Sequence, residues 1–217
     1  MISPLLANIY LHELDRQFHA GHGPAGAAQA RLVRYADDFV ILAKHVGARI
    51  DRWVKRVVED HLGLTLNRVK TRTVDLKQEG ASLDFLGYTF RFDQDLQGRS
   101  RRYLNVFPSK KSVKRICEKV RDLTGPSMCF KPTPILVGEL NTLLRSWASY
   151  FSGGYPAMAY RDVEVHTRYR LWKHLNRRSQ RGYRWSRDCT IYAHLRALGL
   201  CDIPRSKTDP LARQGPK

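Results

Sequence analysis

The segment RLVRYADDFVILAK, residues 31–44, carries the most informative pattern in the chain. Apolar runs at residues 32–33 and 39–42 have the length of two short strands, and the polar pair Asp37-Asp38 falls between them. Aspartate favours turns because its side chain can bond to nearby backbone groups. The stretch therefore predicts a β-hairpin with two adjacent carboxylates at its turn.

Two adjacent carboxylates at a hairpin turn have two interpretations. The simpler is a solvated turn, in which Asp-Asp is common. In a partly buried setting the carboxylates would repel one another and resist desolvation, and a divalent cation with a preference for oxygen ligands would remove both costs. Two such ions about 3.5–4 Å apart can activate a 3′ hydroxyl and stabilise leaving pyrophosphate in nucleotidyl transfer.

Outward from the hairpin, the first half of the chain mixes helices and strands. Helical spacing of apolar residues predicts helices over residues 3–20 and 47–62, with a Gly/Ala-rich loop over residues 21–29. Residues 64–76 and 82–92 favour strands.

The second half of the chain is predicted to be mainly helical. A polar turn over residues 93–102 leads into a strand that ends at residue 107. Amphipathic helices are predicted over residues 109–123, 135–151, 157–178 and 187–198, before an aperiodic tail from residue 204. The predicted fold class is therefore α+β, with a mixed unit followed by a basic helical one.

Positive charge is concentrated in the second half. Residues 1–100 hold 14 Lys and Arg against 12 Asp and Glu, whereas residues 101–217 hold 24 against 8, a net charge of +16. A polyanion is the natural partner of such a segment. Nucleic acid is favoured over an anionic membrane surface, because Trp and Tyr are interleaved with arginine in segments that also carry a core periodicity.

Composition narrows the class of protein further. The chain is 42% hydrophobic, as in ordinary folded proteins, and no run of 18 apolar residues predicts a membrane span. The N-terminus lacks the basic region of a signal peptide. We therefore expect a bacterial-type cytoplasmic location, associated with nucleic acid. The cysteines form no CxxC pair and suit free thiols in a reducing compartment: Cys117, Cys129, Cys189 and Cys201.

Five motifs in one order carry a resemblance to a known family. They are ISPLLANIYL at residues 2–11, YADD at 35–38, LGLTLNRVKT at 62–71, FLGY at 85–88 and NTLLRSWASYF at 141–151. The chain resembles group II intron-encoded reverse transcriptases/maturases over roughly residues 2–185. The YADD segment matches the YxDD signature of the polymerase palm, and the last motif resembles the maturase-specific region.

The resemblance implies roles for the palm residues. Asp37 and Asp38 would be catalytic ligands of a two-ion Mg²⁺ site, and Lys70 would stabilise charge or protonate pyrophosphate. A solvated lysine remains the alternative for Lys70, and a core role the alternative for Phe85. The residues expected at the primer and incoming deoxynucleotide are Tyr35, Ala36, Phe85, Leu86 and Gly87.

The resemblance also implies that the basic helices hold intron RNA and the RNA template/DNA primer. A solvated basic face is the alternative, and Trp147 is expected in the core. The first expected RNA-binding cluster is Lys110, Lys111, Lys114 and Arg115. The second is Arg177, Arg178, Arg181, Arg184 and Arg187, interleaved with Tyr183 and Trp185, which suit base stacking.

The motifs divide the chain into a partial palm over residues 1–107, a thumb/maturase region over 108–185 and a basic extension over 186–217. A complete enzyme of this family carries fingers and an earlier palm aspartate, and neither is found before Met1. We therefore expect no polymerase activity from this chain alone, and possible dependence on a separate N-terminal chain. A decayed intron, a split gene or a start codon within a longer frame would each explain this. The alternative function is that of a non-catalytic RNA-binding remnant or pseudogene product.

Overall fold

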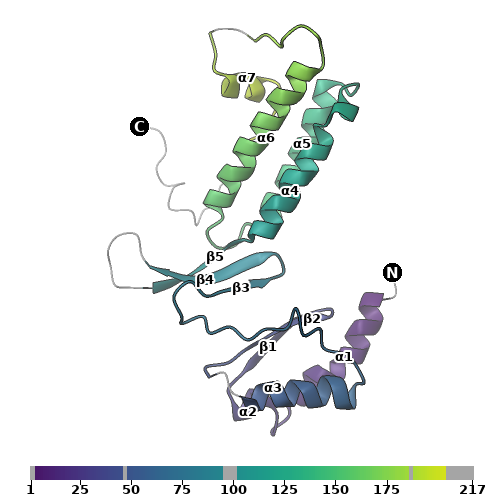
Figure 1. Cartoon of the computed structure of the whole chain (residues 1–217), viewed down its shortest axis with the longest axis vertical. Helices are drawn as coiled ribbons and strands as arrows, with labels where there is room; N and C mark the ends of the chain where they lie inside the picture. The colour runs from purple at the N-terminus through teal and green to yellow at the C-terminus, as the bar shows by residue number, and fades with distance from the viewer. Residues whose placement is uncertain (1–2, 46–47, 95–101, 186–187, 204–217) are drawn as a thin grey trace. The chain divides into compact units, whose positions relative to one another are not determined.

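The computed structural model describes residues 3–45, 48–94, 102–185 and 188–203 (Figure 1). The chain forms two compact units, residues 1–75 and 76–217. Helices combine with small antiparallel sheets in the described chain, which confirms the α+β prediction.

The first unit packs two helical segments against one face of the predicted hairpin. Its elements are α1 (Ser3–His19), α2 (Pro24–Ala27), β1 (Arg31–Tyr35), β2 (Asp38–Leu42), α3 (Ala48–Lys55) and η1, a π-helical continuation (Arg56–His61). Leu14 and Phe18 of α1 are fully buried, and the Phe18 ring meets the Trp53 ring edge to face at 5.6 Å. Leu32 and Ile41 pack on this core from the hairpin. On the other face of the hairpin Val33, Tyr35 and Leu42 are exposed.

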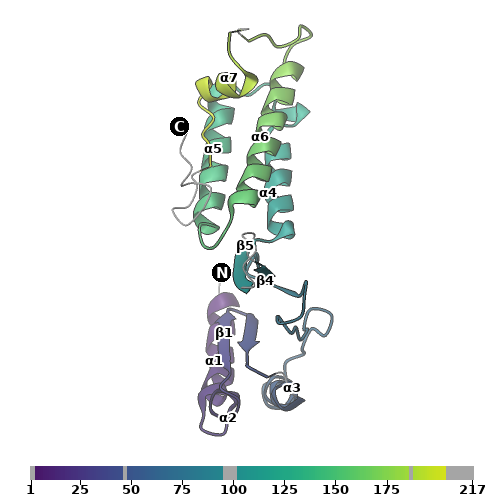
Figure 2. The same ribbon diagram turned by 90° about the vertical axis from the view of Figure 1, so that its left-hand side faces the viewer.

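The second unit joins a three-stranded sheet to a helical bundle. The antiparallel sheet has the order β3 (Ser82–Phe85), β4 (Tyr88–Gln94) and β5 (Arg102–Pro108). The helices are α4 (Lys110–Leu123), the 3-10 turn η2 (Pro126–Met128), α5 (Thr133–Tyr150), α6 (Ala157–Arg177) and α7 (Ile191–Ala197). Figure 1 and Figure 2 both show α4, α5 and α6 side by side.

Apolar residues at helical spacing hold the bundle together. Ile116 and Val120 of α4 are buried against leucines of α5 and α6, as the amphipathic pattern predicts. Trp147 also packs against this core, as predicted. Ser109 begins α4 by accepting a hydrogen bond from the Ser112 N–H at 3.2 Å. No helix among the described residues is both long enough and apolar enough to cross a bilayer.

Two predicted strands are wrong. Residues 64–76 form no strand, although all of them are described. Asn67 turns the chain there, because its carbonyl accepts from the N–H groups of Lys70 and Thr71 and its side chain also accepts from Lys70. Residues 82–92 form two strands rather than one, since the chain reverses at Leu86-Gly87.

Smaller differences occur at turns and helix ends. Residues 21–29 contain the single turn α2. The last helix is shorter than predicted and begins after Thr190, whose side chain accepts from the Ala193 N–H. The predicted turn at residues 93–102 lies mostly outside the described residues, and the strands on its two sides, β4 and β5, pair antiparallel. The predicted aperiodic tail from residue 204 also lies outside them.

Candidate nucleotidyl-transfer turn and nucleic-acid interface

The YADD hairpin closes through a two-residue loop, Ala36-Asp37. Tyr35 pairs directly with Asp38 across the strands, so Asp38 begins β2 instead of lying in the turn as predicted. Ala36 has a φ of 52°, in the left-handed region that residues with a side chain seldom adopt. Such a conformation persists where neighbouring contacts impose it.

Arg34 supplies those contacts. Its guanidinium donates to the Ala36 carbonyl at 2.9 Å and to Asn8 Oδ1 of α1 at 2.8 Å. It also forms an ion pair with Asp15 of α1, with 2.5 Å between Nη2 and Oδ2. The hydrogen bond from Asp15 raises the pKa of Arg34 further above its ordinary value. Arg34 therefore fixes the strained turn to the helix that precedes it.

The hairpin presents its polar groups to solvent. Asp37 and Asp38 are both exposed, and Tyr35 is 66% exposed. Adjacent carboxylates suit a hard cation such as Mg²⁺ in donor chemistry. Within the described residues, however, no group of three or more Asp, Glu, His or Cys side chains could hold a metal ion. The donors fit the ion, but their number is below what a two-ion site uses.

Lys70 lies in the irregular segment after η1. It is exposed, and its backbone N–H is bonded to Asn67. Among the described contacts, none joins the Lys70 side chain to the hairpin. The catalytic role implied for Lys70 by the motif therefore stays a prediction.

The FLGY segment forms a second tight turn, which is fixed to the helical bundle. Leu86 and Gly87 both have positive φ, 49° and 82°, as in the two-residue turns that match the twist of paired strands. The Gly87 carbonyl accepts from the Ser109 N–H at 2.8 Å and from Ser112 Oγ at 2.9 Å. The Tyr150 hydroxyl of α5 donates to the Leu86 carbonyl at 2.9 Å. Phe85 precedes this turn and is half-buried.

The first predicted RNA-binding cluster lies on the solvent side of α4. Lys110, Lys111, Lys114 and Arg115 are all exposed in the first turns of this helix. Lys114 lies 3.9 Å from Glu118, and both side chains are at least half exposed, so this ion pair is weak. Exposed cations at a helix N-terminus oppose the helix dipole, which leaves them suited to an anionic partner.

The structure divides the second predicted cluster. Arg181 and Arg184 line an open hollow of about 460 Å³ in the loop after α6. Tyr183 of this loop packs against the core, and its hydroxyl lies 2.6 Å from His194 Nε2, which favours a structural role over base stacking. Trp185 is 36% exposed. Arg187 lies outside the described residues.

Arg177 and Arg178 lie at the end of α6. The sequence analysis missed two further arginines, Arg170 on α6 and Arg121 on α4. Arg170 is half-buried, and its pKa is lowered by burial and by the positive charges of Arg121 and Arg177. Arg178 donates to the Thr133 hydroxyl at the start of α5. The spacing of seven residues between Arg170 and Arg177 places both on one side of a helix and could have indicated the pair.

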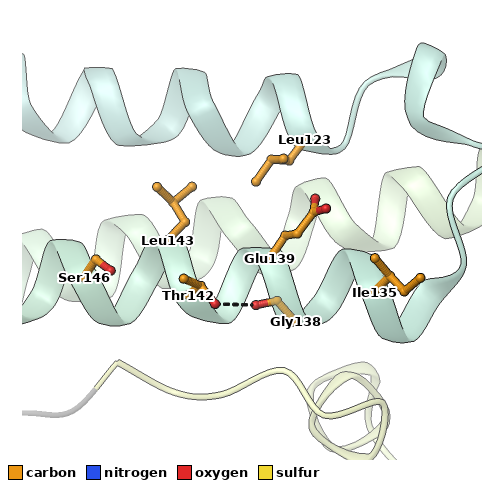
Figure 3. Close-up of a pocket in the computed structure, with 7 residues that line it drawn as sticks. All are labelled: Leu123, Ile135, Gly138, Glu139, Thr142, Leu143 and Ser146. Atoms are coloured by element: carbon orange, nitrogen blue, oxygen red, sulfur yellow. Dashed lines mark hydrogen bonds between the residues drawn. The ribbon is translucent and has the colours of Figure 1, made fainter.

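A separate groove of about 620 Å³ runs along α5 beside the end of α4 (Figure 3). Leu123, Ile135 and Leu143 give it an apolar lining. Its one charged residue, Glu139, forms an ion pair with Lys131 at 2.7 Å. None of the predicted site residues lines this groove, and its chemistry does not suit nucleic acid.

Known protein families match both parts of the chain. Residues 1–90 match the model of reverse transcriptase (RNA-dependent DNA polymerase), and residues 113–207 match that of the group II intron, maturase-specific domain. This chain belongs to the group II intron reverse transcriptase/maturase family. No curated protein matches the chain. The resemblance seen in the motifs is confirmed, and the match over residues 1–90 fits a C-terminal part of the palm.

Membership of this family gives the two regions their general chemistry. Reverse transcriptases use divalent metal ions, and maturase domains imply binding of intron RNA. The exposed YADD carboxylates lie in the reverse transcriptase match, and most of the basic helical surface lies in the maturase match.

We expect Arg34→Lys to destabilise the first unit by about 1–3 kcal/mol, because lysine cannot reproduce the forked hydrogen bonds to Asp15, Asn8 and Ala36. Hydrogen exchange of peptides from residues 3–61, followed by mass spectrometry over a urea series, measures the loss. The matched control is Arg16→Lys, since Arg16 also pairs with a carboxylate but its side chain is 70% exposed. Equal stability of the two variants would show that Arg34 does not hold the turn.

Gly87→Ala is expected to destabilise the second unit more than Gly80→Ala does. The difference between the two losses should be about 1–3 kcal/mol. Both glycines have positive φ, 82° and 75°, so both variants suffer the same kind of backbone strain. A Cβ at position 87 would lie 2.8 Å from Ser112 Oγ and 3.2 Å from Phe151 Cζ, whereas one at position 80 would meet nothing within 4 Å. Chemical denaturation measures both losses, and equal values would contradict close packing of the FLG turn.

Proposed function

We propose that the helical part of the chain binds intron RNA as a maturase, through phosphate contacts from its exposed cations. The observation that supports this most is the net charge of +16 over residues 101–217. The described cations of both predicted clusters are exposed. Phosphate contacts account for most non-specific affinity for nucleic acid, and they release counterions.

The proposed RNA-binding residues are those of the two predicted clusters. Lys110, Lys111, Lys114 and Arg115 would bind along α4, and Arg177, Arg178, Arg181, Arg184 and Arg187 would bind around the end of α6. In this proposal residues 108–185 act as thumb and maturase region, and residues 186–217 extend the basic surface.

RNA binding is expected to weaken steeply with salt, with log K falling linearly against log salt concentration by about 0.7–0.9 for each phosphate contact. Fluorescence anisotropy with a labelled intron RNA fragment measures this slope. Replacing Lys110, Lys111 and Arg115 together by glutamine should make the slope shallower, whereas Asp37→Asn should leave it unchanged. Undetectable or salt-insensitive binding would contradict the maturase proposal.

A second activity, RNA-directed DNA synthesis, is favoured by the braced YADD turn. In this proposal Asp37 and Asp38 hold Mg²⁺, which would neutralise the triphosphate and activate the primer hydroxyl. Tyr35 and Ala36 lie at the nucleotide, Lys70 supports the triphosphate, and Phe85, Leu86 and Gly87 hold the primer. Because the described carboxylates are too few for two ions, a further aspartate has to come from elsewhere, such as a separate palm chain.

Primer extension tests this second activity. We expect no template-dependent synthesis from this chain alone, and Mg²⁺-dependent synthesis once a polypeptide with fingers and the earlier palm aspartate is added. Asp37→Asn should abolish that synthesis, whereas Asp51→Asn, an equal charge change on α3, should not. Synthesis that is the same in wild type and Asp37→Asn would exclude a catalytic role for the turn.

A further inference from the structure

Arg170 of α6 lies at the end of α4, with Arg121 on α4 and Arg177 further along α6. Arg170 of α6 reaches the end of α4, with its Nε 3.2 Å from Thr124 Oγ1 and its Nη2 3.3 Å from the Arg121 carbonyl oxygen. Arg177 lies two helical turns further along α6, and Arg121 belongs to the last turn of α4. The positive charges of Arg121 and Arg177 both act on Arg170.

The Arg170 guanidinium is held by a buried framework. Thr124 is fully buried, and its hydroxyl donates to the Val120 carbonyl at 2.7 Å. The Thr124 carbonyl lies 3.3 Å from Nδ1 of His174, which is also fully buried. An arginine has five N–H donors, and the described contacts of Arg170 use two of its nitrogens. Donors therefore remain for a ligand, in a fixed direction.

No carboxylate in the described part of the chain lies within ion-pair distance of the three arginines, although Asp122 follows Arg121 in α4. No Asp or Glu there forms an ion pair with Arg121, Arg170 or Arg177. Arg168, on the same helix, instead contacts both Glu164 and Asp202, the latter at 2.5 Å. Ion pairs thus neutralise Arg168, whereas Arg170, two residues further on, experiences the positive charges of Arg121 and Arg177.

Capping of α4 explains only part of this arrangement. A cation at a helix C-terminus is stabilised by the exposed carbonyls, and this accounts for Arg170. The same effect favours Arg121 in the last turn of α4 and Arg177 in the last turn of α6, but it does not pair their charges, which repel Arg170. An anion bound beside Arg170 would relieve this repulsion, and planar guanidinium groups match phosphate oxygens in pairs.

We propose that Arg121, Arg170 and Arg177 together form a site for a backbone phosphate of RNA. The proposal rests on the RNA binding proposed above and assigns one contact point within it. Arg121 and Arg170 are additions to the clusters predicted from sequence. A free phosphate ion shares the same chemistry, and the experiment has to separate the two sources.

The first measurement is RNA affinity of the full chain across a salt series. Arg121→Gln and Arg177→Gln should each weaken binding roughly three- to tenfold at 0.1 M salt and reduce the salt slope by about one. Both residues are exposed, so the variants should fold. Arg161→Gln is the matched control, because Arg161 is an exposed arginine of α6 nine residues before Arg170. If wild type binds RNA and all three variants bind equally well, the phosphate site is wrong while the maturase proposal stands.

The second measurement locates the ligand through His174. Burial, followed by the charges of Arg178, Arg177 and Arg170, lowers the pKa of His174. RNA bound at the cluster should raise the pKa of His174 in the wild type and in Arg161→Gln, but much less in Arg177→Gln. NMR of the His174 ring protons across a pH series measures this pKa. Inorganic phosphate alone is the comparison ligand. A rise with phosphate but none with RNA would assign the cluster to a free anion and overturn the proposal.

Discussion

The second unit has to bury an apolar core while keeping an excess of cations in water. Residues 101–217 hold 24 Lys and Arg against 8 Asp and Glu, so most of these cations cannot be paired within this segment. The helices α4 and α6 therefore bury Ile, Leu and Val on one side and expose Lys and Arg on the other. The surface needed for a polyanion thus follows from the way in which the bundle folds, because burying an unpaired lysine or arginine would cost far more than exposing it.

The two tight turns show a second common feature. In each, a residue with a side chain adopts a left-handed φ, Ala36 in the first unit and Leu86 in the second. Each is held by donors from outside the turn, namely Arg34 for Ala36 and Tyr150 for Leu86. Local sequence does not favour either conformation, so the neighbouring contacts have to stabilise it. Both turns coincide with the motifs YADD and FLGY, where a fixed backbone suits the positioning of a substrate.

Sequence predicted the elements whose signals are local. The YADD hairpin and the helices α1, α4, α5 and α6 follow from apolar periodicity, which reports on burial directly. The strand predicted at residues 64–76 failed because Asn67 bonds to the next turn of backbone, an effect that alternation of side chains does not reveal. The FLGY reversal was missed because its β-rich flanks concealed a turn that includes leucine. The Arg121–Arg170 contact joins residues 49 apart and needs the packed bundle to exist.

Arg168 and Arg170 show how the pairing of cations within the fold can indicate a ligand site. Both lie on α6, yet Arg168 contacts Glu164 and Asp202, while the hydrogen bonds of Arg170 to described residues reach a hydroxyl and a carbonyl of the α4 end. Asp202 also pairs with Arg196 at 2.6 Å, so Glu164 and Asp202 together join α6 to α7 and the segment after it. These two acidic residues stabilise the bundle and form no ion pair with Arg170. A cation such as Arg170, which packing holds in place without an acidic partner, therefore indicates a ligand site better than a cation on a mobile surface side chain. Repulsion from neighbouring cations destabilises the fold there, and an anionic partner removes that repulsion.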